Sequence, residues 1–371
     1  MKSKNNWIIG IMIVLIILGV VYYYQSQKKD ESVIKIGASL PLSGQNAVYG
    51  IEIQNAIELA KDDINNNGGI NGKKLKVIYE DDEADTATGT NVINKLVNID
   101  KVPVVLGSWA SGVVVAEAPI AEKNRVIIMA VAISPAITHA GDYIFRIQPS
   151  ATFYTSKSAE FLRDKGINTS AIIYVNNEFG KSLKDFFTSD FEKKGGKVVA
   201  IESYYEGDND FRAQLIKIKE KNPEVIFIPG YQDTIEVIKQ IKELGIKSLI
   251  LAGPPFESQS TIEKLGKDAE GILYPYHFVA GESNKKTQAY EKDYLTKYHK
   301  TTGGFAPLMY DATYIISDVL KKCDKNTDCI KNELYNIEYK GISGNITFDS
   351  NGDPELPIFM KTIKNGEFVK Y

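Results

Sequence analysis

From residue 33 onward, short apolar runs alternate with stretches of helical periodicity, and this alternation limits the possible fold more than any other feature. Residues 33–40 (VIKIGASL) predict a strand, and apolar residues at steps of three and four over 53–64 predict an amphipathic helix that ends at Gly68–Gly69. Further strands are expected at 74–80, 102–107 and 125–132, with helices at 92–99 and 112–123. Near-continuous apolar strands alternating with helices are typical of a parallel sheet covered on both faces.

A second series of the same kind follows FRIQPS (145–150). Its expected strands are 171–175, 197–205, 224–230, 248–253 and 270–278, and its expected helices are 181–194, 211–219, 234–244 and 258–265. Two long helices are expected at 287–299 and 307–322, and the tail segments 342–349 and 357–369 are interpreted as a hairpin-like β pair. Two such series in 371 residues predict two lobes.

The N-terminal region carries an uncharged apolar stretch at 7–24, WIIGIMIVLIILGVVYYY. It is long enough to cross a bilayer as a helix, and its terminal tyrosines suit a membrane interface. A cleaved signal peptide is the alternative, although the stretch exceeds a usual signal core and no small-residue cleavage site follows it. We therefore expect the chain from about Lys28 to lie at the extracytoplasmic face of the membrane, anchored by this helix, or to be periplasmic or secreted after cleavage.

The chain has two cysteines, Cys323 and Cys329, which bracket the polar loop CDKNTDC. An extracytoplasmic compartment permits a disulfide between them, and two unpaired thiols are the alternative. No cysteine precedes this pair, so a lipid-modified N-terminal cysteine is excluded. None of the three histidines is near the pair in sequence, so no metal site is expected.

Several function classes lack support in the sequence. The net charge is −3, and acidic and basic residues are interleaved, so no nucleic-acid partner is expected. The chain has no GxSxG, HExxH, phosphate-loop or GxGxxG motif. We therefore expect no catalytic residues and no cofactor.

Polar and aromatic residues gather in loops that follow the predicted strands. The loop at 39–50 contains Tyr49, and the loop at 106–112 (LGSWASG) contains Trp109 and Ser111. Ser111 is expected to cap the helix that begins near Gly112, where free N–H groups and its hydroxyl suit a polar ligand; a plain N-cap is the alternative. Loops at 176–182, 229–234 and 253–259 hold equivalent positions in the second series. Together they predict a small-molecule cleft between two lobes.

Several segments resemble, in order along nearly the whole chain after Val33, the branched-chain amino acid class of periplasmic solute-binding proteins. They are residues 34–85, 107–126, 145–150, 178–182, 210–231 and 344–354. The resemblance implies an α/β type I periplasmic-binding fold, with two doubly wound parallel-sheet lobes joined by a three-strand hinge. After an N-terminal segment 1–32, it assigns 33–149 plus 280–340 to one lobe and 150–279 plus 341–371 to the other. Its implied partners are a small-molecule ligand, enclosed by hinge motion, and the permease subunits of an ABC importer.

The resemblance also implies the ligand-binding residues. Ser111 matches the serine that binds the ligand carboxylate, and Phe305 lies where an aromatic ring closes over the ligand side chain. The other implied site residues are Tyr49, Trp109, Ala132, Ile133, Phe179, Tyr231, Pro255 and Phe256.

Three of these positions depart from the family pattern. Ile133 replaces the usual Thr, Phe179 replaces a common Tyr, and Pro255 stands where an acid often pairs with the ligand ammonium. Glu257 could substitute for that acid only if the loop has a different path. A buried ammonium without a carboxylate partner is costly. Two ligand classes are therefore expected: a neutral amino acid, or a carboxylate or amide with an apolar body and no ammonium. A ligand-sensing receptor ectodomain of the same fold is the alternative function.

Overall fold

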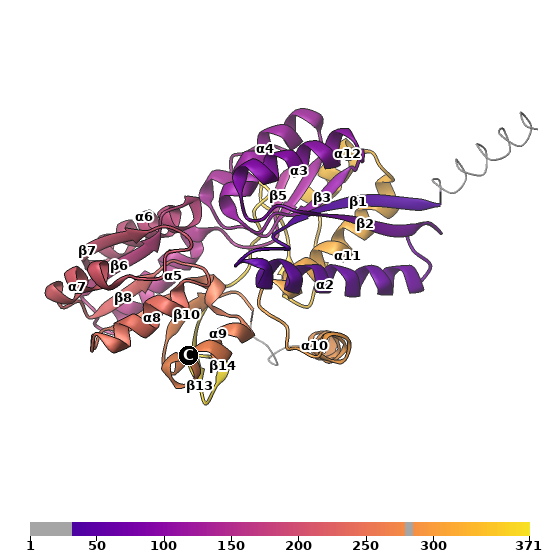
Figure 1. Ribbon diagram of the computed structural model, residues 1–371. Helices are drawn as coiled ribbons and strands as arrows, with labels where there is room; N and C mark the ends of the chain where they lie inside the picture. Colours follow the sequence, from indigo (N-terminus) through magenta and orange to yellow (C-terminus); the bar gives the residue numbers. More distant parts are fainter. Residues whose placement is uncertain (1–31, 279–284) are drawn as a thin grey trace, which may run out of the picture.

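The computed structural model describes residues 32–278 and 285–371 (Figure 1). Two α/β lobes are visible in it: the first consists mainly of indigo-to-purple elements and also holds orange helices from later in the chain, and the second consists mainly of red-to-orange elements (Figure 1). The apolar stretch 7–24 lies outside the described residues. Within the described ranges, no helix combines the length and the apolar character that a membrane span requires.

The first lobe contains a sheet of five parallel strands in the order β2-β1-β3-β4-β5. The strands are β1 (Val33–Leu40), β2 (Lys74–Asp81), β3 (Val104–Gly107), β4 (Ile127–Ala130) and β5 (Ile144–Arg146). The helices packed around this sheet are α2 (Ala47–Asn66), α3 (Thr86–Asn98), α4 (Ser111–Asn124), α10 (Lys285–Tyr298), α11 (Ala306–Cys323) and α12 (Thr327–Tyr335).

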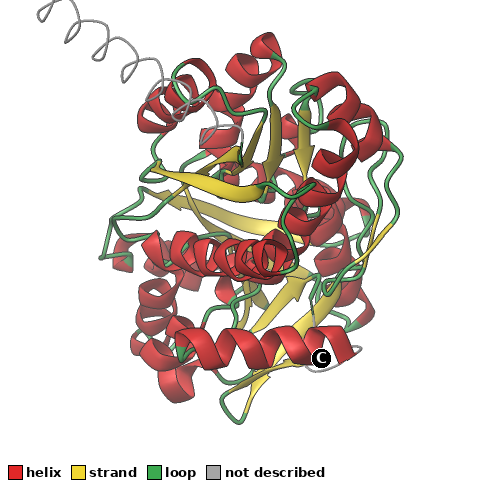
Figure 2. Cartoon of the chain, turned by 90° about the vertical axis from the view of Figure 1, so that its right-hand side faces the viewer, coloured by secondary structure: helices red, strands yellow, loops and turns green. Residues whose placement is uncertain are grey.

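Both faces of this first sheet are covered by helices, as the view in Figure 2 shows. Val104 and Leu106 of β3 belong to the cluster that includes α2 and α11, whereas Val105 belongs to a separate cluster with α3 and α4. Successive strand residues point to opposite faces, so each face needs its own apolar side chains. This explains why the strands are continuous apolar runs in the sequence.

The second lobe contains a seven-stranded sheet in the order β14-β13-β10-β9-β8-β6-β7. Its strands are β6 (Thr169–Val175), β7 (Lys197–Tyr204), β8 (Val225–Ile228), β9 (Leu249–Ala252), β10 (Leu273–Tyr276), β13 (Phe359–Lys364) and β14 (Glu367–Lys370). Its helices are α5 (Ala151–Asp164), α6 (Glu178–Lys193), α7 (Arg212–Lys221), α8 (Thr234–Glu243) and α9 (Gln259–Leu265), with short 3₁₀ turns at Pro254–Phe256 and Gly266–Ala269. Strands β6 to β10 are parallel, and β13 and β14 add an antiparallel edge.

The expected pairing of 342–349 with 357–369 is wrong. The hairpin forms within the second segment, because Asn365 and Gly366 (φ 54° and 75°) make a tight turn between β13 and β14. The other edge of β13 pairs with β10, so neither edge is open to the earlier segment. That segment instead contributes β12 (Asn345–Ile346), which pairs with β11 (Tyr339–Lys340).

The described elements change from one sheet to the other three times: after β5, after β10 and before β13. A buried ion pair joins two of these crossings. Arg146, at the end of β5, donates from Nε and Nη2 to the carboxylate of Asp353 at 2.6 and 2.5 Å. The Nη1 of Arg146 also donates to the carbonyl of Ser134 at 2.9 Å. The crossings agree with a three-strand hinge, while the exact lobe bounds stay a prediction.

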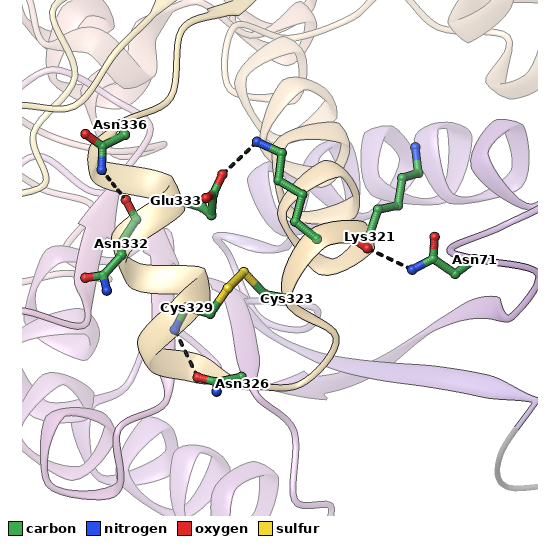
Figure 3. Close-up of a disulfide and its surroundings, with 9 residues drawn as sticks. Asn71, Lys321, Cys323, Asn326, Cys329, Asn332, Glu333 and Asn336 are labelled. Atoms are coloured by element: carbon green, nitrogen blue, oxygen red, sulfur yellow. Dashed lines mark hydrogen bonds and ion pairs between the residues drawn. A yellow bond between two sulfur atoms is a disulfide. The ribbon is translucent and has the colours of Figure 1, made fainter.

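Cys323 and Cys329 form a disulfide, so the prediction of a disulfide rather than two free thiols is confirmed (Figure 3). It joins Cys323, the last residue of α11, to Cys329 in the first turns of α12, with 5.5 Å between their Cα atoms. The Asn326 side chain caps α12 by accepting from the Cys329 N–H at 3.0 Å. The bond therefore fixes the turn between two helices of the first lobe.

Candidate functional site

A buried cavity lies where the two lobes meet. It is lined by Trp109, Ser111, Val131, Ala132, Ile133, Gln148, Phe179, Tyr231, Pro254, Pro255 and Phe305. All except Phe305, which precedes α11, follow the carboxyl ends of parallel strands in one sheet or the other. Ligands of open α/β sheets bind at this edge.

Aromatic rings fill most of this cavity. The Trp109 ring lies 4.7 Å from Tyr231 between centroids, and Tyr231 lies 4.7 Å from Phe179. Phe305 meets Trp109 edge-on at 6.0 Å. The free volume of the cavity is about 10 Å³, which is room for about one water molecule. A larger solute therefore enters only when the rings move or the lobes separate.

Eight of the ten side chains expected in the site line this cavity, and Tyr49 and Phe256 do not. Tyr49 lies in the first turn of α2 and stacks behind Trp109, with 4.4 Å between ring centroids. Phe256 belongs to the 3₁₀ turn after β9 but packs beside Tyr274, at 5.5 Å between centroids. Ligand contact by each of the ten stays a prediction.

Ser111 is not the helix cap that the sequence predicts. Helix α4 begins at Ser111 itself, so Ala110 occupies the N-cap position and offers no capping side chain. The Ser111 hydroxyl instead accepts a hydrogen bond from the Ser134 N–H at 3.3 Å, which ties the loops after β3 and β4 together. Ser134 in turn donates from its hydroxyl to Glu178 of the second lobe at 2.6 Å.

Glu257 does not take the place of the acid that Pro255 lacks. Its carboxylate is buried and accepts from Lys361 Nζ at 2.6 and 2.8 Å and from the Tyr274 hydroxyl at 2.8 Å. Burial raises the pKa of Glu257, and the charge of Lys361 opposes that rise. Glu257 is committed to these partners and does not line the cavity, and no side chain that lines it carries a charge.

The sequence analysis did not single out Val131, Pro254 and Gln148. Val131 and Pro254 adjoin predicted site residues and add apolar wall. Gln148 is polar and only 1% exposed, and its Nε2 donates to the Tyr154 hydroxyl at 3.2 Å. The sequence feature that could have identified Gln148 was its place in FRIQPS, directly after a predicted strand.

A buried acid network supports the loop that carries Trp109. Asp82 accepts from the Ser108 hydroxyl at 2.5 Å, and the Ser39 hydroxyl, with one hydrogen to share, lies 3.2 Å from Asp82 Oδ2 and 2.7 Å from Glu117 Oε1. Burial raises the pKa of both carboxyls, and the hydrogen bonds from the serine hydroxyls oppose that rise. Within 32–278 and 285–371, no group of three or more His, Cys, Asp or Glu side chains is placed to hold a metal ion.

Hydrogen bonds cross the cleft beside the aromatic cluster. The Tyr49 hydroxyl donates to the carbonyl of Pro255 at 3.1 Å and accepts from Gln232 Nε2 at 2.9 Å. Asn46 Nδ2 donates to the carboxylate of Glu206. Each contact joins an element of the first lobe to one of the second, so the cavity is closed.

Two α/β lobes that close over a buried cavity at the carboxyl ends of their strands define a binding protein of the two-lobed class. The model of the periplasmic binding protein family matches residues 33–367, and the chain belongs to this family. With its two lobes and three crossings, it has the type I periplasmic-binding fold.

Known relatives agree with this assignment. A Leu/Ile/Val-binding protein homologue of Brucella suis is 26% identical over 87% of this chain and 88% of its own length. A leucine-binding protein of Thermotoga maritima superposes with a TM-score of 0.86 at 26% identity, covering 91% of this chain and 97% of that one. The branched-chain amino acid transporter substrate-binding protein of Streptococcus pneumoniae, solved with isoleucine, gives 0.85 at 28% identity, covering 91% and 99%.

Proposed function

We propose that this protein captures a small, largely apolar solute in the cavity between its lobes and delivers it to the permease subunits of an ABC importer. Its family membership and the names of its relatives support a transport role. The aromatic lining supports an apolar solute body, because burying such a body against rings is favourable.

The polar end of this solute is a carboxylate or an amide without an α-ammonium. The observation that carries this choice is the uncharged lining, together with the commitment of Glu257 to Lys361. An ammonium enclosed there would lose its hydration without gaining a carboxylate partner. A neutral amino acid is the second candidate, favoured by the relatives named for leucine, isoleucine and valine.

Thermal unfolding with matched ligands separates these candidates. Leucine is compared with 4-methylpentanoate and 4-methylpentanamide, which keep its apolar body and remove the amino group. We expect the compounds without the amino group to raise the melting temperature more than leucine does. Stabilisation by leucine, isoleucine and valine alone would reject the proposed ligand class.

A double substitution at positions 133 and 255 tests the roles of these two residues directly. Ile133→Thr with Pro255→Glu restores a hydroxyl and an acid, so affinity for leucine should rise by about tenfold or more. Ile133→Thr with Pro255→Gln is the matched control, because it has nearly the same shape and no charge. Equal leucine affinity in the two double variants would show that an acid at 255 does not reach the ligand.

We further propose that residues 7–24 hold the protein at the outer face of the cytoplasmic membrane. Their length and the absence of charge support a span. The full chain should sediment with membranes, whereas a chain that starts at residue 28 should not. A full chain recovered in the soluble extracytoplasmic fraction, with a new N-terminus by mass spectrometry, would instead identify a cleaved signal.

A further inference from the structure

Gln148 is a buried polar residue whose hydrogen bonding is incomplete. It lies two residues after β5, on the first crossing between the lobes, and lines the cavity. Its Nε2 is bound to Tyr154, whereas its Oε1 is buried and has no hydrogen-bond partner among the described residues. A buried carbonyl oxygen that has lost water calls for a donor.

A buried relay fixes the orientation of this amide. The Tyr154 hydroxyl lies 3.2 Å from Gln148 Nε2 and 2.7 Å from His277 Nδ1. Burial raises the pKa of Tyr154, so its hydroxyl keeps its proton. Burial also lowers the pKa of His277 to about 3, so the ring is neutral near pH 7 and can accept from Tyr154 at Nδ1.

The relay runs from Gln148 through Tyr154 to His277, because the Tyr154 oxygen accepts from Gln148 and its single hydrogen is then free for His277. Gln148 donates to Tyr154 and Tyr154 donates to His277 Nδ1, which leaves Gln148 Oε1 and His277 Nε2 buried without a partner among the described residues. The reverse direction would turn the amide over and place its NH₂ group, with two donors, where Oε1 now lies.

We propose that Gln148 is a specificity-determining residue that accepts a hydrogen bond from a neutral N–H or O–H donor of the ligand. The inference rests on the proposed function and narrows it. Of the two polar ends considered, a carboxylate offers only acceptors to Gln148 Oε1 and would repel it, whereas a primary amide offers a donor. The carbonyl oxygen of the amide would then remain for donors such as the Ser111 hydroxyl. The ligand class is thus a primary amide with an apolar body.

Calorimetric titration of the full chain tests this with three probes that share one apolar body. They are 4-methylpentanamide, 4-methylpentanoate and methyl 4-methylpentanoate. Wild type should bind the amide about tenfold more tightly than the ester, which lacks a donor, and more tightly than the carboxylate. Gln148→Met keeps the side-chain length and removes both polar atoms. It should reduce the amide-to-ester ratio below about threefold and leave ester affinity within about threefold of wild type.

Two further variants separate recognition from structure. Tyr154→Phe removes the group that positions the amide of Gln148, so it should lower the amide-to-ester ratio and leave ester binding in place. Gln214 of α7 is half-buried and does not line the cavity, so Gln214→Met is the matched control and should leave the ratio unchanged.

The outcomes are distinguishable. Any of three results would overturn this inference and leave the proposed function intact. Wild type could bind the probes without preferring the amide, or it could bind the carboxylate more tightly than the amide. Gln148→Met could also weaken the binding of all probes equally. Leucine is titrated alongside the three probes, and if it binds most tightly and loses that binding in Gln148→Met, Gln148 is assigned to an ammonium and this inference is overturned as well. Binding of none of the probes would overturn the proposed function and this inference together.

Discussion

Glu52 is a carboxyl group enclosed inside the first lobe. It lies on α2 and is 9% exposed, and it packs so closely against the backbone at Gly303 that an added Cβ there would lie 1.9 Å from its Oε2. Burial raises its pKa to about 8, partly opposed by the charge of Lys300. Near neutral pH this carboxyl therefore stays largely protonated in the folded chain.

That pKa makes folding stability depend on pH. The folded value of about 8 lies above the ordinary 4.5, so between them the folded chain holds a proton that the unfolded chain has lost. The stability that this proton contributes is full below about pH 4.5 and is lost as pH rises through 8. Glu52→Gln should leave stability nearly unchanged at pH 4.5 and increase it at pH 8 by several kcal/mol, on the order of 4. Urea unfolding at the two pH values measures the difference.

The exposed Glu83 provides the control, because Glu83→Gln removes an acid in water. An equal effect of Glu52→Gln at both pH values would contradict the prediction.

The residues of the site differ in how far the sequence could predict them. Trp109, Tyr231 and Phe179 follow strand ends, and parallel strands bring those ends to one edge, so local patterns suffice. The environments of Gln148 and Glu257 depend on distant partners. Tyr154 and His277 are in contact although 123 residues separate them in the sequence, and 104 residues separate Glu257 from Lys361. No local pattern encodes such contacts.

At the scale of elements, the apolar runs predicted the parallel strands because each run is buried on both faces. The tail was predicted less well, since the pairing of short strands depends on which sheet edge is open. The crossings between lobes depend on the same kind of long-range contact. Arg146 and Asp353 lie 207 residues apart and form a buried pair between β5 and the segment before β13.

The carboxylate of Asp353 should contribute strongly to the free energy of unfolding as long as the guanidinium of Arg146 is present. Asp353→Ala leaves a buried guanidinium without its carboxylate, which should cost about 3–5 kcal/mol of unfolding free energy. Adding Arg146→Met removes the stranded charge, so the double variant should be more stable than Asp353→Ala alone. Chemical denaturation of the three proteins measures both effects. A double variant that is less stable than the single one would show that the pair contributes through packing rather than charge.

At the scale of the whole molecule, closure depends on a few contacts between lobes. The Tyr49 hydroxyl has two of them, to Pro255 and Gln232, while its ring backs Trp109. One side chain therefore connects the aromatic wall of the cavity with the closure of the cleft. Ligand affinity is reduced in proportion to the fraction of molecules that can close.

Tyr49→Phe should accordingly shift the chain toward the open arrangement while keeping the aromatic wall. Loss of two hydrogen bonds, each worth about 1 kcal/mol, should weaken binding of the tightest panel compound by up to about thirtyfold. Small-angle X-ray scattering should give a larger radius of gyration at the same ligand concentration. Tyr79→Phe is the matched control, because the Tyr79 hydroxyl bonds to Glu58 within the first lobe, at 2.8 Å. If both variants weaken binding equally, closure does not depend on the Tyr49 hydroxyl; if only Tyr49→Phe does, the hydroxyl couples the two lobes.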